Sequence, residues 1–186
     1  MKIYTIIGGV NGVGKSSLSG VLKSRTTDLG LIIDVDRITA SLGLGMVEGG
    51  KTAIRMIDKC ISEGVNFTQE TTLSSHQVLS TIKRARDEGY YIRLYYIGLN
   101  SLEESKRRID NRVARGGHNI PEEDIERRFE SRWDSVKRIL PYCNEAAFYD
   151  NDNGFVEVAA FRNGELILEG DYRPLWLAEL QTALKP

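Results

Sequence analysis

The chain contains the segment Gly9-Val10-Asn11-Gly12-Val13-Gly14-Lys15-Ser16, which fits the pattern Gly-x-x-x-x-Gly-Lys-Ser. A short apolar, β-branched run, Ile3 to Ile7, stands directly before it, and helix-forming residues resume at its end. A strand, a glycine loop and a helix in this order surround one point with backbone N–H groups, which bind phosphate. This feature restricts the chain to folds in which a strand leads into a phosphate-binding loop. The alternative is a chance glycine turn.

Each residue type in this loop suits a particular contact with a bound nucleotide. Glycines let the backbone N–H groups turn inward around the β-phosphate of a nucleotide, and the N-terminus of the following helix adds partial positive charge. Lys15 is predicted to bridge the β- and γ-phosphates, and the hydroxyl of Ser16 to bind Mg²⁺. We therefore predict that residues 9–17, which end at Ser17, bind ATP together with Mg²⁺.

Apolar runs and amphipathic segments alternate along the rest of the chain, which predicts an α/β fold with a mainly parallel five-stranded sheet flanked by helices. The predicted strands after the first are 31–36, 65–70, 90–97 and 146–149. The pair Asn163-Gly164 between two further apolar runs is typical of a β-hairpin, and a helix is predicted over 174–184. With 186 residues, of which 41% are hydrophobic, one P-loop NTPase domain is expected.

The segment of about 101–132 is predicted to be a helical lid. Ser101 and Glu104 have the spacing of a capping box, which begins a charged helix, and Gly116-Gly117 interrupts that helix. Pro121 followed by acidic residues is typical of the first turn of another helix. The hairpin and the last helix, about 154–186, complete the same domain.

Two carboxylates end the second predicted strand, at the edge where open α/β sheets place their ligands. One is expected to face the phosphate and the other to point away and cap a neighbouring helix. We favour Asp36 as the group that orients an acceptor hydroxyl and accepts its proton, which leaves the capping role to Asp34. A pair of turn carboxylates is the alternative.

Glu70 ends the third predicted strand and is followed by Thr71, so both are expected at the same edge of the sheet as Lys15 and Asp36. The carboxylate could hold Mg²⁺ through water or bind an acceptor hydroxyl. A helix-capping role is the alternative for Glu70.

The predicted lid is rich in basic residues, which are Lys106, Arg107, Arg108, Arg112, Arg115, Arg127, Arg128 and Arg132. Charge runs are usually solvated faces. Phosphoryl transfer leaves negative charge on the γ-phosphate oxygens, however, and a mobile lid can supply arginines that neutralise it. At least two of these arginines are therefore expected to be functional. His118 could contact ligand or lie on the surface, and His76, inside a predicted helix, is expected to be structural.

Bulk composition excludes several classes of function. The net charge of −1 and the pI near 6.2 provide no basic field for a nucleic acid backbone. Cys60 and Cys143 stand in no CxxC or Cys/His cluster, so neither a disulfide framework nor a structural zinc site is indicated. The first apolar run is too short to span a bilayer, and a cytoplasmic protein is expected.

Four segments in this order carry a family resemblance. They are the loop Gly9 to Ser16, Ile33-Asp34-Val35-Asp36, Phe67-Thr68-Gln69-Glu70-Thr71-Thr72-Leu73-Ser74, and Arg112-Val113-Ala114-Arg115-Gly116-Gly117-His118-Asn119-Ile120-Pro121, with Ile125-Glu126-Arg127-Arg128 after it. Together they resemble the zeta-toxin family of P-loop kinases, and the Gly-Gly-His segment is similar to its short chromosomal branch.

The resemblance implies a fold like that of nucleoside monophosphate kinases and transfer of the γ-phosphate of ATP to a hydroxyl of UDP-N-acetylglucosamine. It implies Lys15, Asp36, Arg112 and Arg128 as catalytic residues, with Arg128 the weaker candidate. It assigns Asp36, Glu70, Thr71 and His118 to the acceptor site. Any antitoxin partner would be a separate protein, and neither a nucleic acid nor a membrane is an expected partner.

Two other readings remain open on the sequence. One is a P-loop kinase for another small alcohol or a polynucleotide end. The other is a binding module that responds to ATP and acts through a partner. Asp36 separates them from each other, because a kinase needs an acceptor base whereas a binding module needs only the loop and Mg²⁺.

Overall fold

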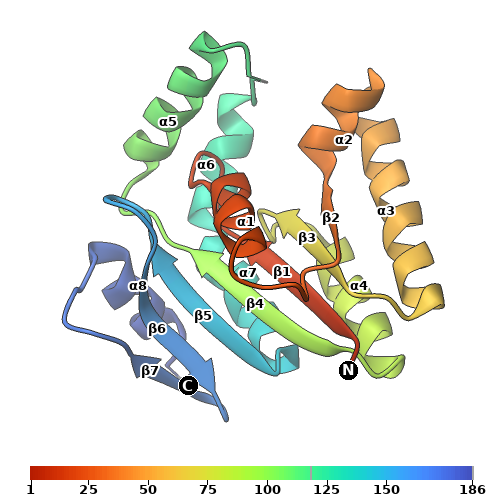
Figure 1. Cartoon of the computed structure of the whole chain (residues 1–186). Helices are drawn as coiled ribbons and strands as arrows, with labels where there is room; N and C mark the ends of the chain where they lie inside the picture. Colours follow the sequence, from red (N-terminus) through yellow and green to blue (C-terminus); the bar gives the residue numbers. More distant parts are fainter. Residues whose placement is uncertain (118, 186) are drawn as a thin grey trace.

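The computed structural model describes residues 1–117 and 119–185, and Figure 1 shows one twisted sheet with helices on both faces. The strands are β1 Ile3–Gly8, β2 Leu31–Asp34, β3 Phe67–Thr71, β4 Tyr91–Ile97, β5 Glu145–Asp150, β6 Val156–Arg162 and β7 Glu165–Leu168. Their order in the sheet is β2-β3-β1-β4-β5-β6-β7. The first five strands are mutually parallel, which confirms the predicted α/β fold and its parallel core.

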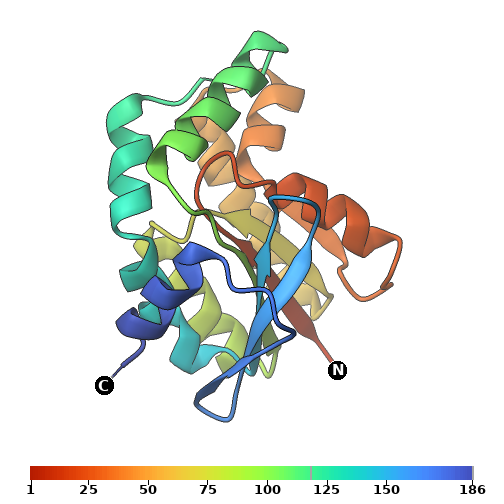
Figure 2. The same cartoon turned by 90° about the vertical axis from the view of Figure 1, so that its left-hand side faces the viewer.

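The helices are α1 Lys15–Lys23, α2 Val35–Leu42, α3 Met46–Glu63, α4 His76–Asp87, α5 Leu102–Ala114, α6 Glu122–Glu130, α7 Arg132–Ile139 and α8 Leu175–Ala183, with a 3₁₀ turn at Leu140–Tyr142. Figure 2 shows α1 on one side of the sheet and α4, α7 and α8 on the other. The α2–α3 pair flanks the β2 edge, and α5 rises beyond the end of the sheet where the phosphate-binding loop lies (Figure 1).

Two apolar cores hold these layers together. The larger core packs even-numbered side chains of β1, such as Tyr4 and Ile6, against α3, α4, α7 and α8. The smaller core packs Ile7 of the same strand against Leu18 and Leu22 of α1. Because successive side chains of a strand point to opposite faces, β1 is buried on both sides, as a central parallel strand should be. This burial fixes the position from which the loop Gly9 to Ser16 leaves the sheet.

The predicted hairpin is confirmed and joins the main sheet. Asn163 and Gly164 adopt φ angles of 55° and 85°, as the central residues of a tight hairpin turn require. β6 pairs antiparallel with β5, and β7 pairs antiparallel with β6. The five-stranded parallel sheet of the sequence-based expectation is therefore extended by two antiparallel strands to seven.

The predicted capping box at Ser101 is confirmed on its N-cap side, since the Ser101 hydroxyl accepts a hydrogen bond of 3.1 Å from the Glu104 N–H. α5 continues to Ala114, and the chain then turns at Gly116, whose φ is 85°. α6 begins directly after Pro121, as expected. α7, which the sequence pattern did not separate from α6, begins at Arg132 and returns the chain to the larger core.

Within residues 1–117 and 119–185, no helix is both long enough and apolar enough to cross a membrane.

Candidate active site

The phosphate-binding loop lies between the buried strand β1 and helix α1. Gly9 has φ 148°, and a Cβ there would lie 2.7 Å from the carbonyl oxygen of Ile97, so the loop passes against β4 at a distance that only glycine allows. Gly14 is the N-cap residue of α1 and has no side chain to cover the first turn. The N–H groups of that turn therefore remain available to an anion.

Lys15 is the charged group of the loop. Its Nζ donates to the carbonyl oxygens of Gly9 and Val10, at 3.0 and 3.1 Å, which folds the side chain back over the loop. Burial lowers the pKa of Lys15 to about 8, against the opposing attraction of nearby carboxylates, of which Glu70 acts most strongly. Lys15 is half-buried, so its ammonium has part of its hydration already replaced by loop carbonyls before a phosphate binds.

Glu70 is 8% exposed and lies one strand away from the loop. The sheet register places Glu70 beside Ile7 of β1 and beside Asp34 of β2, so the three form a row at the carboxyl edge. Glu70 accepts hydrogen bonds from the hydroxyls of Ser16 at 2.7 Å and Ser19 at 2.5 Å. The carboxylate thus contacts the residue predicted to bind Mg²⁺, and both contacts come from α1.

Asp34 and Asp36 belong to different elements. β2 ends at Asp34, whose side chain caps α2 by accepting from the N–H groups of Asp36 at 3.0 Å and Arg37 at 3.5 Å. Asp36 stands in the first turn of α2, where its charge suits the helix dipole. The expectation that Asp36 lies in the strand is wrong, because the chain turns into a helix one residue earlier. The expected capping role of Asp34 is present.

The charge environment of Asp34 differs from that of an exposed cap. Burial raises the pKa of Asp34, and the nearby carboxylates of Glu70 and Asp36 raise it further. The carboxylates of Asp36 and Glu70 therefore lie close enough to Asp34 for their charges to act on it. A carboxylate in such surroundings binds a proton more readily than an isolated one does.

The two lid arginines that the resemblance singled out, Arg112 and Arg128, both reach the site. Arg112 of α5 lines a cavity at the loop together with Lys15, and its charge also lowers the pKa of Lys15. Arg128 of α6 donates from Nη1 to Oδ1 of Asn11 at 3.2 Å, which places its guanidinium against the loop. Arg128 also pairs with Asp124 on its own helix, at 3.5 Å. His118 lies outside the described residues.

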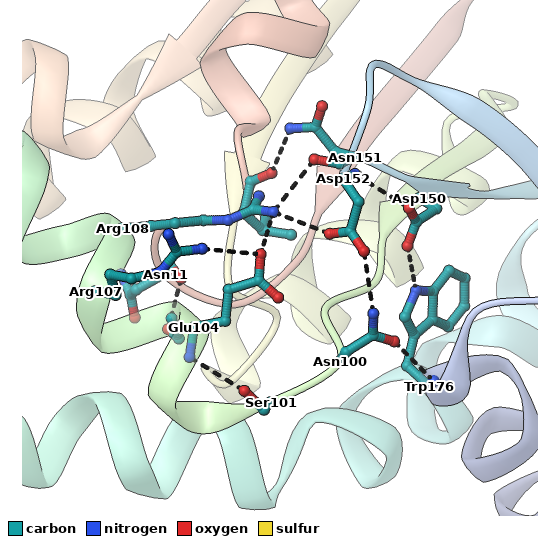
Figure 3. A network of polar contacts seen from close by, with 12 residues as sticks. Asn11, Asn100, Ser101, Glu104, Arg107, Arg108, Asp150, Asn151, Asp152 and Trp176 are labelled. Carbon is teal, nitrogen blue, oxygen red and sulfur yellow. Dashed lines mark hydrogen bonds and ion pairs between the residues drawn. The ribbon is translucent and has the colours of Figure 1, made fainter.

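Arg108 also lines this cavity and was not singled out from the sequence. Its Nη2 donates to Asn151 O at 3.2 Å and to Asp152 Oδ1 at 3.1 Å, and it pairs with Glu104 (Figure 3). Because Arg108 stands four residues before Arg112, both occupy one face of α5. That spacing is the sequence signal that could have identified it.

Two cavities meet at these residues. The loop cavity, of about 260 Å³, lies over the phosphate-binding loop and is lined by Asn11, Gly12, Gly14, Lys15, Ser16, Ser17, Asp34, Asp36, Glu70, Arg108 and Arg112. The α3 cavity, of about 330 Å³, lies between the α2–α3 pair and the turn after β3. Thr71 and Arg128 line the α3 cavity, and so do apolar side chains of α3.

The two cavities share one wall, which consists of Asn11, Lys15, Asp34, Asp36 and Glu70. The structure thus brings Lys15 together with the predicted carboxylates Asp36 and Glu70. Arg112 lines only the loop cavity, and Thr71 and Arg128 line only the α3 cavity. A group bound on the loop and a group bound beside α3 would meet at Lys15 and Asp36.

Comparison of sequences identifies relatives of this chain. A family model described as zeta toxin matches residues 48–153, more than half of the chain. The matched span contains Glu70, Thr71, Arg112 and Arg128, and the phosphate-binding loop precedes it. An uncharacterized protein of Haemophilus influenzae is 32% identical over 126 residues, which cover 65% of this chain and 88% of that protein.

Two solved structures are similar in fold. A chain of the PezAT chromosomal toxin-antitoxin system of Streptococcus pneumoniae has a TM-score of 0.64 at 17% identity, over 98% of this chain and 84% of that one. A chain of AvrRxo1-ORF1:-ORF2 with ATP has a TM-score of 0.68 at 17% identity. That match covers 99% of this chain and 63% of the other, so this chain spans less than two thirds of it.

Proposed function

The chain belongs to the zeta-toxin family of P-loop kinases, and from this premise we propose that it transfers the γ-phosphate of ATP to a hydroxyl of a sugar nucleotide. The proposed acceptor is UDP-N-acetylglucosamine, as the family resemblance implies. ATP would occupy the loop cavity and the acceptor the α3 cavity. The lid, residues of about 101–132, would close over both within a single domain of residues 1–186.

The observation that carries this proposal is the wall shared by the two cavities. Lys15 and Asp36 line both the loop cavity and the α3 cavity. A kinase needs such an arrangement, because the γ-phosphoryl group must pass directly from one bound substrate to the other. A module that only binds ATP has no use for a second cavity with a carboxylate at the junction.

Each residue has a definite task in this scheme. Lys15 neutralises the charge that develops on the transferring phosphoryl group, and the N–H groups of the loop hold the β-phosphate. Asp36 orients the acceptor hydroxyl and accepts its proton as the oxygen attacks phosphorus. Arg112 and Arg128 stabilise the transition-state charge from opposite sides, the first from the loop cavity and the second from the α3 cavity.

The residues at the loop fit Mg²⁺. The Ser16 hydroxyl and the Glu70 carboxylate, 2.7 Å apart, are oxygen donors of the kind that Mg²⁺ prefers, and Mg²⁺ in such sites takes its other ligands from water and phosphate. When bound, the ion would withdraw charge from the phosphate oxygens. Ser16 and Glu70 would hold it, directly or through water. This contact favours the metal role for Glu70 over direct recognition of the acceptor.

The α3 cavity supports an acceptor with both polar and apolar parts. Its polar lining includes Asp36, Glu70, Thr71 and Arg128. Its apolar lining comes from α3 and α4 and includes Met46, Ala53, Ile54, Ile57 and Val78. A sugar nucleotide offers hydroxyls to the polar residues and a flat base or an acetyl methyl group to the apolar ones. The proposed place of action is the cytoplasm, where ATP and sugar nucleotides are available.

We further propose an antitoxin as a separate protein partner. The support is the family together with the fold likeness to a chain of the PezAT toxin-antitoxin system. Expression of the wild-type chain and of its Lys15→Ala variant, each in a separate bacterial culture, tests toxicity. The proposal requires growth arrest with the wild type and normal growth with the variant.

An acceptor screen tests the proposed reaction. The protein is incubated with Mg²⁺ and ATP labelled at the γ-phosphate, in the presence of nucleotide sugars, free sugars or a 5′-hydroxyl oligonucleotide. The proposal expects label in a nucleotide sugar, and transfer slower by roughly 100-fold or more with Asp36→Asn. Transfer to the oligonucleotide or to a free sugar would show that the acceptor is not a sugar nucleotide. Release of inorganic phosphate alone with every acceptor would reject the kinase reaction.

A further inference from the structure

Asn151, the residue that follows strand β5, contacts the phosphate-binding loop. Its side-chain Nδ2 donates a hydrogen bond of 3.0 Å to the carbonyl oxygen of Val13, across 138 positions of sequence (Figure 3). Val13 itself is fully buried in the smaller core, so the loop is held between this core and the turn that joins β5 to β6. The contact therefore links the turn after β5 to the backbone of the phosphate-binding loop.

The hydrogen bond fixes the orientation of one peptide group. In a planar trans peptide the C=O and the following N–H point in opposite directions. With the Val13 carbonyl directed at Asn151, the N–H of Gly14 is directed away from Asn151. Gly14 lines the loop cavity, where an inward N–H is a donor to a phosphate oxygen.

Gly14 gives this peptide both its geometry and its freedom to rotate. Its φ is 100°, which is accessible to glycine and strained for other residues. A Cβ at this position would lie 2.6 Å from Nδ2 of Asn151. The Asn151 amide therefore approaches the Gly14 backbone more closely than it could approach a residue that carries a side chain. Because glycine has little conformational preference of its own, an external contact is needed to hold the peptide in one orientation.

Asn151 is itself firmly held. The preceding Asp150 is 2% exposed and accepts hydrogen bonds from Trp176 Nε1 at 2.8 Å and from the Asp152 N–H at 3.1 Å. From the other side, Arg108 donates to the Asn151 carbonyl and to the Asp152 carboxylate. Figure 3 shows these contacts converging from α5, α8 and the loop. Because the backbone that carries Asn151 is anchored in this way, its side chain can impose an orientation on the glycine peptide that it contacts.

We propose that Asn151 is a positioning residue of the nucleotide site, which holds the Val13–Gly14 peptide so that the Gly14 N–H faces the phosphates of ATP. The inference rests on the proposed binding of ATP at this loop. It assigns to the turn after β5 a part in nucleotide affinity. It predicts no part in acceptor binding, because the α3 cavity lies on the other side of Lys15.

Two substitutions at this position test the proposal. Asn151→Ala removes the donor. Asn151→Asp keeps the size of the side chain but turns an acceptor toward the Val13 carbonyl, so it tests the donor even if the alanine variant does not fold. Asn153→Ala and Asn153→Asp are matched controls, since Asn153 is an exposed residue of the same turn and the aspartate adds the same charge.

Binding of ATP and of inorganic tripolyphosphate is measured by calorimetry, and the KM for ATP and for the acceptor by steady-state kinetics. We expect Asn151→Ala to weaken both binding constants on the order of tenfold, which is the loss of one hydrogen bond to a charged group. Asn151→Asp should lose more. The KM for ATP should rise while the KM for the acceptor stays constant. A purely structural role would instead lower the melting temperature and the active fraction, and would leave the KM for ATP unchanged.

Three outcomes would overturn the inference. ATP affinity of a folded Asn151→Ala or Asn151→Asp variant equal to that of the wild type would overturn it while leaving the proposed function intact. Equal losses of ATP affinity in Asn151→Asp and Asn153→Asp would show that the added negative charge, and not the lost donor, weakens binding. A wild-type protein that binds neither ATP nor tripolyphosphate would reject the proposed function and this inference together.

Discussion

Substituting Asp34, the last residue of β2, and Asp36, in the first turn of α2, separates a structural role from a catalytic one. Asp34→Asn and Asp36→Asn each remove one negative charge at positions two residues apart. Both residues line the wall between the loop cavity and the α3 cavity. Any difference in turnover therefore reflects what each carboxylate does and not the net charge of the site.

The structure sets the expected size of each effect. An asparagine at position 34 can still accept from the N–H groups of Asp36 and Arg37, and asparagine caps helices about as well as aspartate, so the free energy of unfolding should change by only a few tenths of a kcal/mol. The raised pKa of Asp34, caused first by burial, also means that its charge is unfavourable there. Asp36→Asn removes the proposed proton acceptor, which is worth roughly 100-fold or more in turnover, about 2.7 kcal/mol in the barrier.

Steady-state kinetics and thermal denaturation of both variants provide the measurement. We expect Asp36→Asn to keep its melting temperature and its KM for ATP while kcat falls by roughly 100-fold or more. Asp34→Asn should keep kcat within about tenfold of wild type, since it retains the cap. A larger loss of kcat in Asp34→Asn than in Asp36→Asn would refute the assignment of the base.

Three further predictions follow from the site and its surroundings. Because burial lowers the pKa of Lys15 to about 8, the ATP binding constant should be flat at lower pH and fall as pH rises through about 8, when the ammonium loses its proton. Calorimetric titration checks this, and a constant affinity above that pH would contradict it. Arg112→Ala should lower kcat by roughly tenfold to a thousandfold with little change in ATP binding, whereas Arg115→Ala, at an exposed position, should change kcat by less than about twofold; equal losses would indicate a diffuse basic surface. Arg132→Ala should lower the free energy of unfolding by about 2 kcal/mol in denaturant titrations, because this side chain is 9% exposed and pairs with Glu179, and kcat per folded molecule should not change.

Local signals in the sequence predicted those parts of the fold that neighbouring residues determine. The loop Gly9 to Ser16 could be recognised because the residue types that a phosphate-binding loop needs recur at fixed spacing in one short segment. The hairpin was predictable because Asn163 and Gly164 tolerate the positive φ that its turn requires. The start of α5 was predictable because Ser101 caps it through the N–H of Glu104.

The second strand and its helix show where local patterns were insufficient. β2 ends at Asp34, and α2 begins at Val35. Val35 and Ile38 are β-branched and weak helix formers, so composition favoured a longer strand. The Asp34 cap favoured a helix start against this composition. The sequence could not reveal that Ile38 packs into the larger core, which stabilises α2.

Contacts between distant segments account for the remaining differences. Arg132 belongs to a charge run of the kind that usually forms a solvated face, and it is buried because α8 supplies Glu179 and α6 supplies the ring of Phe129. Asn151 resembles an ordinary turn residue until the fold brings it to Val13. Such roles depend on which elements the sheet order places side by side, and no short sequence window contains that information.

Phosphorus NMR of the complete reaction tests the central claim most directly. Wild-type protein is mixed with ATP, Mg²⁺ and UDP-N-acetylglucosamine, and the spectrum is followed alongside that of Asp36→Asn. The account predicts a new phosphomonoester signal on the sugar nucleotide that grows in step with ADP in the wild type and does not appear in the variant. ADP formed together with free phosphate, beside an unchanged sugar nucleotide, would contradict it.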